Sequence, residues 1–275
     1  MPIFFTWRHK LKKLFFILGI VMAFSFCSCV SSKVNNGSNN ANLSHFAGDW
    51  QLIFAEKAGI AQSITNATIH IENPKGDKLN FEGFLGVNDF FGTCELEKDG
   101  EVDDERFSRT KKMGLPQTMA AENIIYEVFE NISDAKIANE GGEKILIISS
   151  DDTNSSIKFK KINISNTKWN LSFIKDSEIV STAFIHFADK NNIFANTGIN
   201  NLQLTYNFND KNGTLNFEAG PMTMMAGDEQ STIIEREFLN AIAECQKYQI
   251  KANNLLLFNQ AGEHLLTFTK EELVK

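Results

Sequence analysis

The sequence Trp50-Gln51-Leu52-Ile53-Phe54 returns 119 residues later as Trp169-Asn170-Leu171-Ser172-Phe173, and this repetition indicates how the chain is organised. In each stretch an apolar residue occupies every second position, which is the pattern of a β-strand with one buried face. We therefore expect Trp50, Leu52 and Phe54, and their counterparts in the second stretch, to point into a hydrophobic core.

Four further segments return in the same order, at spacings close to that of the first. They are Ile69–Ile71 at Ile185–Phe187, Gly86–Asp89 at Gly198–Asn201, Thr110–Gly114 at Thr223–Gly227, and the helix-spaced apolar residues Ile125, Val128, Phe129 and Ile132 at Phe238, Ala241, Ile242 and Cys245. Ordered matches at a nearly constant spacing indicate that one structural unit has been duplicated.

Each copy predicts an α+β domain, that is, a mainly antiparallel β-sheet with one amphipathic helix packed on it. The helices are expected near residues 119–132 and 232–245, where apolar residues form one stripe, and Thr232 with Glu235 fits a capping box at the start of the second. Lys211-Asn212-Gly213 is typical of a hairpin turn between antiparallel strands.

We expect the two domains at residues 46–161 and 166–270. The predicted strands are 50–54, 68–71, 78–84, 144–149 and 157–159 in the first copy, with 169–173, 184–187, 202–208, 255–258 and 265–268 in the second.

The N-terminus has the three parts of a secretory signal. Cations lie between Arg8 and Lys13, an apolar run spans residues 14–26, and Ser28-Cys29 resembles the cleavage site of a bacterial lipoprotein. We expect a signal peptide at 1–28, lipid attachment at Cys29 and a flexible Asn- and Ser-rich tether over 29–45. An ordinary signal peptide with two incidental cysteines is the alternative. The lipid would place the protein in the bacterial cell envelope, and we expect the outer membrane.

Composition and charge exclude one class of partner. Removal of residues 1–28, which carry four cations and no acid, takes the formal charge from -7 to -11. Such a surface repels nucleic acid, so we expect none as a partner. The 24 Phe residues, against 3 Trp and 3 Tyr, indicate an aromatic core that needs few hydrogen bonds.

The repeated motifs resemble those of the META-domain family, which includes HslJ-type heat-inducible lipoproteins. That family has a Trp-x-Leu strand, a Gly-Cys-Asn motif, a Thr-x-Met-Ala-Cys motif and a helix that carries Glu. The matching residues of the second copy are Trp169, Leu171, Gly198, Asn200, Thr223, Met225, Ala226 and Glu235. The resemblance covers residues 166–270 well and 46–160 more loosely, and it implies a link to stress and to tolerance of some antibiotics.

Both family cysteines are replaced in both copies. Val87 and Gly114 stand at these positions in the first copy, and Ile199 and Gly227 in the second. If the cysteines pair in relatives, their joint loss leaves no single thiol to mispair. We expect an apolar residue to face a glycine at each site, and no disulfide within either domain. The shared motif positions are then structural: Trp50, Gly86, Asn88, Thr110 and Gly114, with Trp169, Gly198, Asn200, Thr223 and Gly227.

The residues that could act in catalysis or in metal binding have simpler structural interpretations. We expect Cys245 to be buried and inert, and Cys94 to lack a base that would activate it. One His per domain cannot make a metal site, so His70 and His186 are interpreted as solvent-facing strand residues. Ser108-x-x-Lys111 is a chance match to the opening motif of penicillin-binding enzymes, and the acidic run 101–105 is interpreted as a solvated loop. Met222, Met224 and Met225 could line a ligand groove, but core packing is favoured.

These observations predict a protein without catalytic activity, cofactor or metal. It would support envelope integrity or stress tolerance by binding another envelope component, either a protein or a hydrophobic ligand, while its lipid holds it to the membrane. The alternative is a ligand-binding or hydrolytic module that uses a pocket on a sheet face, which would require polar groups to converge there.

Overall fold

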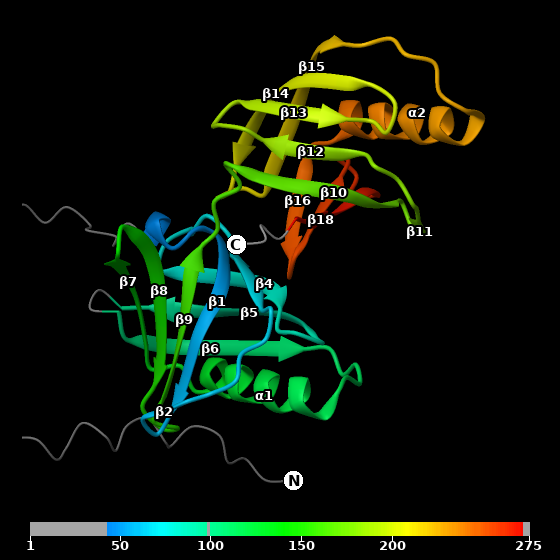
Figure 1. Ribbon diagram of the computed structural model, residues 1–275. Helices are drawn as coiled ribbons and strands as arrows, with labels where there is room; N and C mark the ends of the chain where they lie inside the picture. Colours follow the sequence, from blue (N-terminus) through cyan, green and yellow to red (C-terminus); the bar gives the residue numbers. More distant parts are fainter. Residues whose placement is uncertain (1–42, 98–99, 272–275) are drawn as a thin grey trace, which may run out of the picture. The chain divides into compact units, whose positions relative to one another are not determined.

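The computed structural model describes residues 43–97 and 100–271, and it consists of two antiparallel β-sheets, each with one helix (Figure 1). The α+β class expected from the sequence is therefore confirmed, twice over. The signal peptide, Cys29 and the tether up to residue 42 lie outside the described residues. No helix in the described part of the chain is long and apolar enough to cross a membrane.

The first sheet has the strand order β6-β5-β4-β3-β1-β9-β8-β7, with β2 paired to β1. Its first and last strands in sequence, β1 and β9, are antiparallel neighbours, and Trp50 is registered with Lys161. The bounds are β1 Gly48–Lys57, β2 Ile60–Ala61, β3 Thr68–Ile71, β4 Lys78–Phe84, β5 Asp89–Leu96, β6 Val102–Arg109, β7 Asp134–Glu140, β8 Glu143–Ser150 and β9 Ser155–Lys161.

The second sheet has the order β11-β10-β12-β13-β14-β15-β16-β17-β18, and β10 also pairs with β18. This additional pairing, with Trp169 registered to Lys270, closes the sheet on itself. The bounds are β10 Thr167–Ile174, β11 Ser177–Glu178, β12 Phe184–Phe187, β13 Asn192–Asn196, β14 Asn201–Asn209, β15 Thr214–Met222, β16 Lys247–Lys251, β17 Asn254–Phe258 and β18 His264–Lys270.

The two opening strands share an irregularity that the alternating pattern does not reveal. In β1 the register shifts between Leu52 and Phe54, and in β10 it shifts between Leu171 and Phe173. A bulge adds one residue to one strand and so inverts the alternation beyond it. Trp50 and Leu52 are buried as predicted, but Ala55 rather than Phe54 is the next buried residue. The prediction that Phe54 points fully inward was wrong for this reason.

Each sheet packs one helix against its buried face. α1 spans Pro116–Glu130 and has Pro at its first position, where the missing N–H costs no helical hydrogen bond. α2 spans Glu229–Glu244, and its N-cap is Asp228, which accepts from Ser231 N. The capping box expected at Thr232 is therefore wrong, because Asp228 starts the helix one turn earlier.

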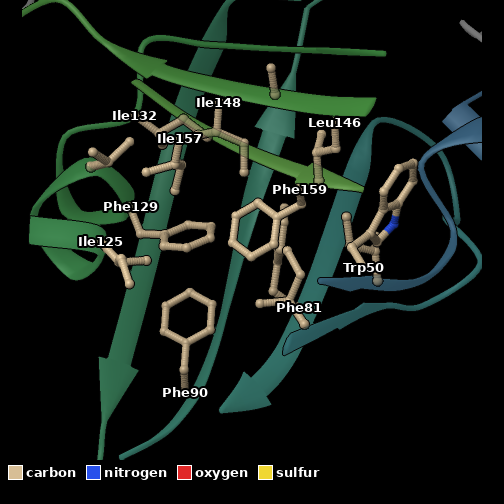
Figure 2. Close-up of a cluster of buried hydrophobic side chains, with 14 of the residues drawn as sticks. Trp50, Phe81, Phe90, Ile125, Phe129, Ile132, Leu146, Ile148, Ile157 and Phe159 are labelled. Carbon is tan, nitrogen blue, oxygen red and sulfur yellow. The ribbon is translucent and has the colours of Figure 1, made fainter. Parts of the chain in front are cut away.

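The two repeats have separate hydrophobic cores. In the first, Phe129 of α1 lies between Phe90 and Phe159 of the sheet, with ring centroids 4.4 and 6.2 Å away (Figure 2). Burial of such a side chain contributes about 1.5–3 kcal/mol. In the second, Phe238 of α2, at the position of Ile125 in the first, packs against Phe268 with ring centroids 6.1 Å apart. Helix and sheet of each repeat are thus joined by aromatic contacts.

Candidate functional site

The motif residues of the first repeat meet around one buried asparagine. Asn88 Nδ2 donates to Glu122 Oε1 at 2.7 Å, while Asn88 Oδ1 accepts from Thr110 Oγ1 at 2.9 Å and from Lys112 N at 2.6 Å. Glu122, on α1, is completely buried. The asparagine therefore joins the turn before β5, the loop after β6 and the helix.

The second repeat builds the same centre. Asn200 Nδ2 donates to Glu235 Oε1 at 2.9 Å, and Asn200 Oδ1 accepts from Thr223 Oγ1 at 2.9 Å and from Met225 N at 2.7 Å. The sequence had placed Asn88 and Asn200 at structural turns. It did not reveal that each is the centre of a hydrogen-bond network, although the equivalent spacing of Glu122 and Glu235 was the signal that could have done so.

The two copies give the helix carboxylate different partners, and Glu122 is completely buried whereas Glu235 is partly exposed. In the first, Glu122 Oε2 accepts from the backbone N–H groups of Val87 and Asn88, both at 2.8 Å, and Oε1 accepts from Arg109 Nη1 at 3.1 Å. In the second, Thr197 Oγ1 donates to Glu235 Oε1 at 2.6 Å and accepts from Asn200 N at 2.9 Å. Leu85 stands where Thr197 does, and Met222 stands where Arg109 does. One copy uses a guanidinium and the other a hydroxyl.

The four positions at which the family resemblance implies cysteine lie in two adjacent pairs. A Cβ atom added at Gly114 would lie 2.5 Å from Val87 Cγ2, and one added at Gly227 would lie 2.2 Å from Ile199 Cδ1. An apolar side chain therefore fills the space beside a glycine in both copies, as the sequence predicted. Gly86 and Gly198, which open the turns before these residues, have φ of +129° and +98°, a region that favours glycine.

Trp50 and Trp169 occupy equivalent buried positions. Trp50 Nε1 donates to Phe46 O at 2.8 Å, and Trp169 Nε1 donates to Thr167 Oγ1 at 2.7 Å. A lysine ammonium from the paired last strand lies over each ring, Lys161 at 4.8 Å and Lys270 at 5.8 Å from the ring centroid. These contacts lie where the first and last strands of each repeat pair with each other.

His70 is not solvent-facing, and that prediction was wrong. Its side chain is 12% exposed, and Nδ1 lies 2.9 Å from Oδ1 of the buried Asp49. Burial lowers the pKa of His70, but the hydrogen bond and charge of Asp49, with the charge of Glu82, outweigh burial and the opposing charge of Lys161, so that the pKa is raised. In the second repeat Lys168, not an acid, is registered opposite His186. The equivalent histidines therefore have different surroundings.

Contacts also join residues of the two sheets, all within the single compact unit that contains the described residues. Tyr248 Oη donates to Asp49 Oδ2, and burial beside this carboxylate raises the pKa of the phenol. Thr68 Oγ1 donates to Ile250 O at 3.1 Å, and Lys161 pairs with Asp210 at 2.8 Å. A cleft of about 530 Å³ next to this contact is lined by His70, Glu82, Lys211, Tyr248 and Phe258, among others.

The remaining candidates are brought into no shared site. Cys94 and Cys245 are free and buried, as predicted for Cys245, and burial raises the pKa of both thiols to about 12. Ser108 lies in strand β6 rather than at a helix start, and residues 102–105 belong to the same strand, so the solvated loop predicted there is wrong. No group of three or more His, Cys, Asp or Glu residues suited to a metal occurs within residues 43–97 and 100–271.

The methionines form the other departure from expectation. Met222, Met224 and Met225 are 38%, 93% and 57% exposed, so the preference for core packing was wrong. They occupy the end of β15 and the loop that leads to α2. The Asn200 side chain hydrogen-bonds to the backbone of Met225, and the methionine side chains lie outside the core.

Comparison with known proteins identifies one family. The model of the META domain matches residues 41–163 and 160–272. Similar solved structures include a protein from Burkholderia xenovorans, 21% identical over 40% of this chain and 85% of that one, with a TM-score of 0.32. A DUF4847 family protein from Bacteroides vulgatus is 14% identical over 40% of this chain and 96% of that one, also at 0.32. No curated protein matches.

Proposed function

Since the chain belongs to the META domain family and contains two tandem copies of the domain, we propose that it is a non-catalytic lipoprotein of the bacterial envelope. It supports envelope integrity under stress by binding another envelope component. Cys29 carries the lipid, and the repeats form the part that binds.

One observation carries the non-catalytic part of this proposal. The polar groups repeated in both copies are engaged with one another: Asn88 with Glu122 and Thr110, and Asn200 with Glu235 and Thr223. A catalytic group needs a lone pair or proton directed at a substrate, whereas these donors and acceptors close the turns onto the helices. The two thiols, with pKa values near 12, are protonated at neutral pH and so are poor nucleophiles.

A surface suited to a partner lies beside the first motif. Met113 and Leu115, in the segment that leads to α1, are 94% and 66% exposed. Neighbouring exposed apolar side chains that form a contiguous patch mark contact surfaces, and Asn88 holds the backbone at Lys112, just before this segment. We propose that this segment contacts the envelope component.

The proposal is tested in a deletion strain challenged with detergent and with a large antibiotic that an intact outer membrane excludes. The wild-type gene should restore resistance, and Cys29→Ala should fail to do so while also losing a fatty-acid label. Met113→Asp with Leu115→Asp should fail although the protein keeps its lipid and its fold. Lys136→Asp, an exposed change on β7, is the matched control and should restore resistance. Full complementation by Cys29→Ala would contradict the proposal.

The cleft beside His70 favours a second candidate, a small-ligand-binding module. Its volume of about 530 Å³ lies within the range of small-molecule sites. Its lining carries both signs of charge, Lys211 against Glu82, together with the aromatic Tyr248 and Phe258. Binding is favoured over hydrolysis, because His70 is already paired with Asp49. A ligand of this kind should raise the melting temperature of the wild-type protein and not that of Lys211→Glu.

A further inference from the structure

The three exposed methionines of the second repeat lie on a loop with a fixed backbone. Thr223 Oγ1 donates to Asn200 Oδ1 at 2.9 Å, Met225 N donates to the same oxygen at 2.7 Å, and Met225 O accepts from Asn200 Nδ2 at 3.2 Å. The backbone is thus held on both sides of Met224. The side chains of Met222, Met224 and Met225 are therefore exposed, while Asn200 holds the backbone of the loop in place.

The three methionines lie close together in the chain. Met222 is the last residue of β15, and Met224 and Met225 follow it in the loop that leads to α2. Four consecutive residues span at most about 11 Å. Each methionine has three rotatable bonds and a polarizable sulfur, so the trio can close around a common ligand.

The equivalent loop of the first repeat carries side chains of a different kind. The residues at the equivalent positions are Arg109, Lys111 and Lys112. Arg109 pairs with Glu122, and Lys112 pairs with Asp89 at 2.7 Å. Three cationic side chains in one copy therefore correspond to three uncharged thioethers in the other, and only the second loop could accept a cation.

We propose that Met222, Met224 and Met225 form a binding site for a soft monovalent cation, with Cu(I) as the natural ligand and Ag(I) as its redox-inert substitute. Thioether sulfur is a soft ligand that selects such ions over Mg²⁺ and Ca²⁺, which require oxygen. Three neutral sulfurs leave the bound ion its single positive charge, which suits a segment with Asp228 and Glu229 three and four residues after Met225. The site is independent of the function proposed above.

The test uses the full-length protein in mild detergent, with Cys27 and Cys29 replaced by Ser so that their thiols do not compete. Methionine methyl groups are labelled with carbon-13, and silver nitrate is added in chloride-free buffer while the methyl resonances are followed. We expect the resonances of the three methionines to shift together and to saturate at one equivalent. Met113, a lone thioether that is 94% exposed, should not shift at that ratio.

The triple variant M222L/M224L/M225L should lose the one-equivalent binding and keep its melting temperature, because leucine is accepted at exposed positions. Met113→Leu is the matched control and should bind as the parent protein does. Anaerobic competition for Cu(I) with a chromophoric chelator should give the same ranking of variants. Equal, unsaturable shifts of Met113 and the trio, or unchanged binding by the triple leucine variant, would overturn the proposal.

Discussion

The helix carboxylates, Glu122 fully buried and Glu235 partly exposed, show how two copies of one motif use different residues at equivalent positions. Glu122 accepts hydrogen bonds from a guanidinium and two backbone N–H groups, whereas Glu235 accepts from a threonine hydroxyl. A buried charge that loses its partner is far more costly than an exposed one. The residue that supplies the partner therefore cannot be exchanged between the copies one at a time.

Arg109→Met, which imports the residue of the second copy, should destabilise the first repeat by about 3 kcal/mol, the lower end of the cost of removing one partner from a buried pair. Adding Leu85→Thr should restore part of this loss, because the new hydroxyl can donate to Glu122 as Thr197 does to Glu235. A double-mutant cycle from urea unfolding measures the coupling. Arg106→Met, at an exposed ion pair, is the control and should have little effect. Additive effects of the two changes would contradict the argument.

At the scale of elements, the turn before β14 and the loop after β15 are held side by side by Ile199 against Gly227. Gly227→Cys alone should destabilise the protein, because its Cβ would lie 2.2 Å from Ile199 Cδ1 and 2.8 Å from Cγ1. With Ile199→Cys the obstruction is removed and a disulfide should form, worth about 3 kcal/mol. Mass spectrometry detects the bond, and the gain in melting temperature should vanish in reducing agent. The pair Val87→Cys with Gly114→Cys should behave alike, and two free thiols in the oxidised double variant would count against it.

The elements also show how far sequence reasoning reaches. Strands with a clear buried face, such as β3, β4 and β12, begin and end where the pattern predicts. β6 was not predicted, because Val102-Asp103-Asp104-Glu105 reads as a solvated loop, although charged residues are common on the outer strand of a sheet. The family motifs located Asn88 and Thr110 of the first Asn–Glu centre and Asn200, Thr223 and Glu235 of the second, but not Glu122. The contact of His70 with Asp49 was not predicted, because the two residues lie 21 positions apart. The contact of Asp49 with Tyr248 was not predicted, because Tyr248 belongs to the other repeat.

For the molecule as a whole, the separate cores predict that the second repeat folds alone. Residues 160–275 contain every member of the second core, from Ile164 to Phe268. This fragment should unfold in one cooperative step on heating, at a lower temperature than the whole protein because Tyr248 loses Asp49. Calorimetry of the fragment, with Tyr248→Phe in the whole protein as a comparison, measures both effects. A gradual melt without a heat-absorption peak would mean that the core is incomplete.

The contact between the repeats should depend on pH through His70. Its pKa is raised above the usual 6.5 in the folded protein, so the stabilisation from its protonated form is complete below about 6.5 and is lost as the pH rises through the folded value. Asp49, Glu82 and Lys161 are the charged groups that act on this histidine, and Tyr248 donates a hydrogen bond to Asp49. The difference in melting temperature between wild type and His70→Gln should therefore shrink as the pH rises above 6.5. His186→Gln is the matched control, and a difference that grows with pH would reverse the argument.

The pairing of the first and last strands of each repeat has a mechanical consequence. Pulling on the chain from its two ends applies force to β1 and β9 at the registered pair Trp50 and Lys161, and to β10 and β18 at Trp169 and Lys270. In an antiparallel ladder loaded at one end, the hydrogen bonds break one after another instead of sharing the load. Each repeat should therefore unfold at low force in one length step, so that the chain shows two steps. Both repeats should refold when the tension is released. A chain built in this way lengthens under a small load.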